Sequence, residues 1–109
     1  MSGTVPQFDA YENPTVTQRE AFPYFVVLQS DQLDQYSPRL VMPLARSTAQ
    51  PAALPRRLSQ TVEVRGERLY LAPHLCATLP HRVLKRPVAS LRADAGSFVD
   101  ALDAVVSGV

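Results

Sequence analysis

AFPYFVVLQSDQLDQYSPRLVMPLA, residues 21–45, is the stretch of the chain that decides the fold. Its first part, residues 21–30, is rich in aromatic and β-branched side chains and too apolar for a surface helix, which predicts a central strand. A polar turn over 30–38 follows, because Asp and Ser side chains hydrogen-bond to their own backbone in such segments. Residues 39–45 then predict a returning strand.

Pro43 lies inside this second strand. A proline has no backbone N–H to donate to a neighbouring strand, so it must lie at an edge, at a bulge or where pairing ends. We therefore expect the strand to stop pairing on one side near Pro43.

The remaining chain also favours short strands, because ten prolines and four glycines exclude most long helices. Residues 47–57 predict a loop with one helical turn around 52–54. Residues 61–72 alternate apolar and polar side chains and predict a hairpin that turns at Gly66–Glu67. Residues 83–91 predict another strand.

The last segment, residues 94–109, is the only one that predicts a helix. Asp94 is placed to cap its start and Gly108 to end it. Apolar side chains recur at helical spacing and predict one buried face, made of Phe98, Leu102, Val105 and Val109.

Composition predicts one soluble globular domain over residues 1–109, since 46% of the residues are hydrophobic and 19% are charged. The single cysteine, Cys76, excludes an intrachain disulfide and fits a reducing compartment. The first residues lack the pattern of a secretion signal, and no apolar run approaches the ~20 residues that span a membrane. We expect a cytoplasmic protein without a membrane anchor.

Charge is unevenly spread along the chain, although the net charge is only +1. Residues 1–38 hold one Arg against five acidic residues, residues 39–92 hold ten Lys and Arg against two Glu, and residues 93–109 hold three Asp. A basic middle between acidic ends would attract an acidic partner or nucleic acid. Folding could equally interleave the three blocks into a mixed surface.

Few residues suggest catalysis or metal binding. His74, Cys76 and His81 form the one metal-like cluster, but a structural zinc site needs four ligands, so we favour a buried cysteine beside two surface histidines. Neither a phosphate-binding glycine loop nor a Ser-His-Asp triad is evident. We expect no metal, no cofactor and no enzymatic activity.

Two basic pairs, Arg56–Arg57 and Lys85–Arg86, could contact phosphates. No aromatic residues alternate with them to form a base-stacking surface, so solvated strand ends and loop are the favoured interpretation. We expect no specific nucleic-acid binding, which leaves a binding function carried by turns and by the C-terminal helix.

Several segments together resemble one family. They are QFDAY at 7–11, FVVLQSDQLD at 25–34, RLVMPLA at 39–45, VEVRGERLYL at 62–71, and a final helix with a Gly-aliphatic end. In this order and spacing the chain resembles the CcdB family, the toxins of type II toxin–antitoxin modules that serve plasmid maintenance. The resemblance implies an α+β fold, an SH3-like, strongly bent antiparallel sheet with a C-terminal helix.

The resemblance also implies a homodimer. A dimer is further expected from Val26, Leu28 and Met42, since apolar strand faces of this size exceed what one small core needs.

The function that the resemblance implies is not catalytic. Such a dimer binds the A subunit of DNA gyrase and holds the enzyme in its cleaved-DNA state, and an acidic CcdA-like antitoxin neutralises it. Family members contact gyrase through a terminal Trp-Gly-Ile, which here reads Ser107-Gly108-Val109, with serine in place of the tryptophan. The implied gyrase-binding positions are Gln32, Leu33, Asp103, Val106, Ser107, Gly108 and Val109. The implied antitoxin-binding positions are Asn13, Arg19, Arg56 and Arg57.

Two alternatives remain open at this point. One is a binding-only relative that sequesters antitoxin without poisoning gyrase. The other is an mRNA endoribonuclease of the MazF and Kid type, which shares the fold and would need an acid–base pair in a basic groove. Its candidate residues are Asp31, Arg39, Arg46 and His74.

Overall fold

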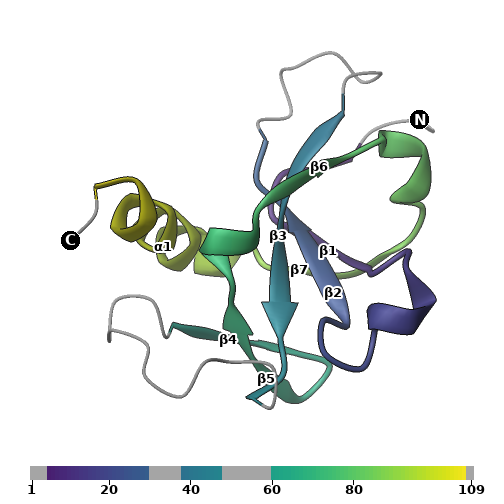
Figure 1. The fold of residues 1–109 in the computed structure, drawn as a ribbon, viewed down its shortest axis with the longest axis horizontal. Helices are drawn as coiled ribbons and strands as arrows, with labels where there is room; N and C mark the ends of the chain where they lie inside the picture. The colour runs from purple at the N-terminus through teal and green to yellow at the C-terminus, as the bar shows by residue number, and fades with distance from the viewer. Residues whose placement is uncertain (1–4, 30–37, 48–59, 108–109) are drawn as a thin grey trace.

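The sheet is built around its longest strand, β3 (Arg39–Ala45) (Figure 1). This computed structural model describes residues 5–29, 38–47 and 60–107. Within them, seven antiparallel strands are ordered β4-β5-β3-β2-β1-β7, and β6 pairs separately with β3. The other strands are β1 (Asp9–Glu12), β2 (Tyr24–Val27), β4 (Thr61–Val64), β5 (Glu67–Leu71), β6 (Ala77–Leu79) and β7 (Pro87–Ser90).

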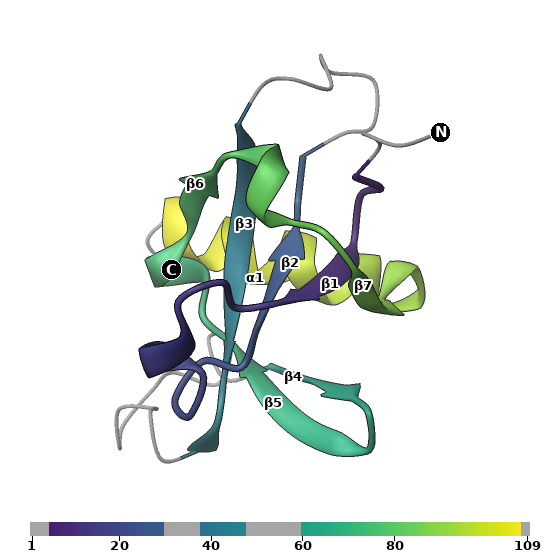
Figure 2. The same ribbon diagram turned by 90° about the vertical axis from the view of Figure 1, so that its right-hand side faces the viewer.

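One α-helix, α1 (Ala95–Ser107), packs on this curled sheet, and 3₁₀ turns join several of the strands. Figure 2 shows α1 crossing behind β3, β2 and β1. The 3₁₀ turns are Val16–Gln18, Pro73–Leu75, His81–Val83 and Arg92–Asp94. The predicted fold class, an α+β protein with an SH3-like bent antiparallel sheet and a C-terminal helix, is confirmed.

Pro43 lies where β3 changes its partner. On one side β3 pairs with β2 along Val41–Leu44. On the other side, Arg39–Val41 pair with β6, whereas Leu44 and Ala45 pair with β5. The Pro43 carbonyl accepts a bond from the Ala72 N–H (3.1 Å) on this second side. The N and O of one strand residue point the same way, so the missing N–H also falls at the partner change, as predicted.

Both faces of the central sheet are buried. Successive side chains of a strand point to opposite sides, so each central strand contributes to two cores. Val26, Leu28 and Met42 lie on the α1 side, in a core that also holds Phe8 and Phe98. A second core on the opposite face contains Val5, Tyr11, Val27, Val41 and Leu84. This double burial explains why the 24–28 segment is apolar at every position.

The burial of these strand residues removes one argument for a dimer. Val26 and Met42 are 0% exposed and Leu28 is 8% exposed within a single chain. The expectation that their apolar faces exceed the needs of one core is therefore wrong, because α1 already covers them.

Several boundaries differ from the sequence predictions. The hairpin turns at Arg65–Gly66 rather than Gly66–Glu67, since Glu67 already pairs with Val64. Both turn residues have positive φ, 52° and 80°, which is the type I′ geometry favoured in two-residue hairpins. The predicted strand over 83–91 is shorter, and β1 and β6 were not predicted. The turn over 30–38 and the loop over 47–57 lie almost entirely outside the described residues.

α1 begins at Ala95, directly after Asp94, as expected. Its buried residues are Phe98, Ala101 and Ala104. The prediction included Phe98 but missed the two alanines. Leu102 is partly buried against the core, as predicted, but Val105 is 39% exposed. Small alanines let a helix approach a sheet closely, so they take the central positions.

The two described glycines offer a matched stability test. Gly66→Ala should destabilise the protein by about 1 kcal/mol, because a φ of +80° disfavours any Cβ although nothing lies within 4 Å of it. Gly96→Ala should stabilise it by about 0.5–1 kcal/mol, because the site is helical and equally open. Urea unfolding measures the change in unfolding free energy for each variant. Changes of the same sign would contradict the assignment of Gly66 to a left-handed turn and Gly96 to a helix.

Candidate functional site

The outer face of α1 carries an exposed stripe. Val99, Asp103 and Val106 follow at spacings of four and three residues, which places them on one side of a helix. All are exposed, and Val106 is 82% exposed. Two valines this exposed on one side of a single helix, with Asp103 between them, mark a candidate contact surface.

This stripe brings together part of the predicted gyrase-binding set. Asp103, Val106 and Ser107 all lie on the exposed side of the last two turns of α1. Gln32, Leu33, Gly108 and Val109 lie outside the described residues. Sequence reasoning missed Val99, although its spacing to Asp103 and Val106 was a readable signal.

Asn13, predicted to contact the antitoxin, is 0% exposed and fastens a loop. Its side-chain amide donates to the Phe22 carbonyl (2.9 Å) and its side-chain oxygen accepts from the Thr15 N–H (2.9 Å). Its own main-chain carbonyl accepts a bond from Nε of Arg19 (2.6 Å). The Asn13 side chain is thus a structural anchor for the loop, and its main-chain carbonyl holds Arg19.

Arg19, unlike Asn13, has a side chain that partly reaches the protein surface. Its side chain is 38% exposed and lies 3.8 Å from the Glu12 carboxylate. It lines a cavity between the loop over residues 13–23 and the segment before β7. Arg56 and Arg57, the other predicted antitoxin contacts, lie outside the described residues.

Arg46 holds the same loop from the other end. Its Nη1 donates to the carbonyls of Arg19 (3.2 Å) and Glu20 (2.7 Å), while Nε donates to the Glu67 carboxylate (2.6 Å). This bond lowers the pKa of Glu67 and raises the pKa of Arg46. The pair therefore stabilises the fold at neutral pH, and its contribution is lost as the pH falls through the lowered pKa of Glu67.

The residues considered for an endoribonuclease are not brought together where they are described. Arg39 is the first residue of β3 and Arg46 directly follows its last residue, so they lie about 23 Å apart along the strand. Arg39 is 4% exposed, and Arg46 is bound to Glu67. His74 lies in the Pro73–Leu75 turn, and Asp31 lies outside the described residues.

The metal-like cluster is also dispersed. His74 and His81 lie in different 3₁₀ turns, separated by β6. Over residues 5–29, 38–47 and 60–107, no three His, Cys, Asp or Glu side chains are grouped as metal ligands would be. Cys76 is half-buried, and this burial raises the pKa of its thiol.

In the part of the chain that the structure describes, no helix combines the length and apolar character needed to cross a membrane.

Comparison with known proteins identifies the family. The CcdB protein family model matches residues 7–108, nearly the whole chain. A search of curated proteins gave no match. The chain, a bent antiparallel sheet with a C-terminal helix, belongs to the CcdB family, whose members are toxins of toxin–antitoxin modules.

Proposed function

We propose that this protein is a toxin that binds the A subunit of DNA gyrase and arrests it in the cleaved-DNA state. One observation carries the proposal. The family match runs to residue 108, and it includes a C-terminal helix on whose exposed side Asp103, Val106 and Ser107 lie. These are positions at which the family resemblance implies contact with gyrase.

The proposal includes the biological setting implied by the family. The toxin acts in the cytoplasm as a homodimer of single domains spanning residues 1–109, and a CcdA-like acidic antitoxin neutralises it. Light scattering at micromolar concentration tests the dimer, and a monomer mass would contradict it.

The decisive experiment is expression without an antitoxin, with growth and trapped gyrase–DNA cleavage complexes measured together. Arrest with trapped complexes supports the proposal. Arrest without trapped complexes would indicate another target, and an RNA cleavage assay would then test the endoribonuclease alternative.

Ser107→Trp should strengthen binding to a gyrase A fragment by about 30- to 1,000-fold. The reason is that a buried aromatic anchor contributes ~2–4 kcal/mol to an interface. Calorimetry or surface plasmon resonance measures the change. Thr17→Trp, an exposed position in the Val16–Gln18 turn and outside α1, is the matched control and should leave affinity unchanged. Equal affinity of Ser107→Trp and wild type would count against this surface.

Ser107 also supports a second candidate function. Serine at 107 offers far less contact area than the family's tryptophan. A binding-only protein that sequesters antitoxin is therefore the alternative proposal. Normal growth, good soluble yield and no trapped complexes would support it.

A further inference from the structure

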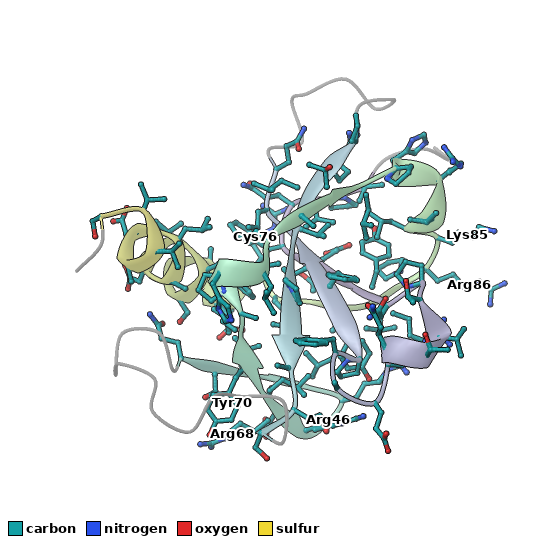
Figure 3. The ribbon with its side chains drawn as sticks, in the orientation of Figure 1. Arg46, Arg68, Tyr70, Cys76, Lys85 and Arg86 are labelled. Atoms are coloured by element: carbon teal, nitrogen blue, oxygen red, sulfur yellow. The ribbon has the colours of Figure 1, made fainter. Side chains whose placement is uncertain are left out.

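A basic cavity lies on the side of the molecule away from α1. It has a volume of about 310 Å³ and lies between the loop after β1 and the segment that leads into β7. Figure 3 shows its two outermost cations, Lys85 and Arg86, on the opposite side of the molecule from α1. The lining residues are Tyr11, Glu12, Pro14, Arg19, Val83, Lys85 and Arg86.

The rim of this cavity is cationic. Arg19, Lys85 and Arg86 face one carboxylate, Glu12, which lies 3.8 Å from Arg19. Lys85 and Arg86 are exposed, and neither forms an ion pair with a described residue. Residues 77–93, which include Lys85 and Arg86, contain four Lys and Arg and no acidic residue, so this segment adds to the positive potential of the rim.

The inner wall of the cavity is apolar. Pro14 and Val83 are partly buried, and Tyr11 is 2% exposed. Burial, together with the nearby charge of Asp9, raises the pKa of Tyr11 to about 12, so its phenol is neutral at physiological pH. An apolar wall beneath a cationic rim matches an apolar side chain flanked by carboxylates.

A nucleic acid fits this arrangement less well. Single strands bind by stacking bases on exposed aromatic rings, and the one aromatic residue of the cavity is almost wholly buried.

We propose that this cavity binds an acidic peptide segment, with an apolar side chain against Val83 and Pro14 and carboxylates at Lys85, Arg86 and Arg19. The proposal extends the antitoxin part of the proposed function, because it specifies where an acidic partner would attach. It names Lys85 and Arg86, which sequence reasoning assigned to solvated strand ends.

The test uses a fluorescein-labelled acidic peptide, acetyl-EDELEDE-amide, and the full chain at about 50 mM salt. Fluorescence anisotropy should detect binding, and replacing the peptide leucine by serine should weaken it. Lys85→Gln combined with Arg86→Gln should weaken binding about tenfold. The matched control, Arg65→Gln with Arg68→Gln, removes the same charge from exposed hairpin positions outside the cavity and should change binding by less than about twofold.

Glu12→Gln provides a test of opposite sign. It removes the carboxylate among the cavity-lining residues and with it the ion pair to Arg19, so peptide affinity should rise by about two- to threefold. In NMR spectra, peptide should shift the amide signals of residues 11–14 and 82–86 most strongly.

Several outcomes would overturn the proposal. They are no binding at about 1 mM peptide, equal weakening by the cavity and hairpin variants, and tighter cavity-dependent binding of a ten-nucleotide oligo-dT than of the peptide. None of these measurements involves gyrase. A failed peptide assay beside trapped cleavage complexes would therefore reject the cavity assignment and leave the toxin proposal standing, and the reverse result would do the opposite.

Discussion

Replacing Phe98 by alanine is expected to lower the free energy of unfolding by about 3–5 kcal/mol. Phe98 is 0% exposed and stacks on Phe8, with ring centroids 5.8 Å apart. It is the largest buried side chain on α1, so its removal leaves a cavity between the helix and the sheet. Such a loss is a large share of the ~5–15 kcal/mol that stabilises a typical domain.

Urea unfolding followed by circular dichroism measures this loss. Phe98→Leu retains much of the volume and should cost less, about 1–2 kcal/mol. Val106→Ala, on the same helix but 82% exposed, is the control and should change stability by less than about 0.5 kcal/mol. A Phe98→Ala variant within about 1 kcal/mol of wild type would show that the helix is not held in this way.

Asn13→Ala is expected to cost about 2–3 kcal/mol although it removes no apolar contact. The variant loses the donor to the Phe22 carbonyl and the acceptor for the Thr15 N–H. A buried polar group left without a partner costs about 1–3 kcal/mol. Because Thr15 is exposed, water replaces part of its bond, and the cost comes mainly from Phe22.

Thermal unfolding should show this as a loss of about 10 °C or more in Tm. Thr17→Ala, an exposed substitution in the same loop, is the matched control and should leave Tm almost unchanged. A stable Asn13→Ala variant would mean that Arg46, which binds the carbonyls of Arg19 and Glu20, holds the loop alone.

The elements that were predictable from sequence are those with local signals. β2 and β3 are dense in β-branched and aromatic residues, and the place of Pro43 followed from its missing N–H. β1 and β6 carry no such signal, since DAYE and ATL are short and mixed. They are strands because β2, β7 and β3 supply their partners, which sequence periodicity cannot reveal.

The candidate surfaces also differ in whether local sequence signals could predict them. Asp103, Val106 and Val99 are neighbours along one helix, so their shared face follows from helical spacing. Arg19 and Lys85 line one cavity only because β1 pairs with β7, and this proximity is invisible in a linear sequence. Asn13 lies in a polar segment typical of a solvated turn, and only its distant hydrogen bonds explain its burial.

The pairing of β1 with β7 joins the two ends of the chain. Phe8, near the start, also stacks on Phe98, near the end. On a ribosome, the first strand therefore waits for almost the whole chain before it gains its second neighbour, and the sheet face beneath α1 stays uncovered until then. Domains of this kind complete folding only after their last element emerges. α1, which presents the proposed contact surface, follows every strand of the sheet along the chain, so a chain that stops before α1 would lack both the Phe98 contact and that surface.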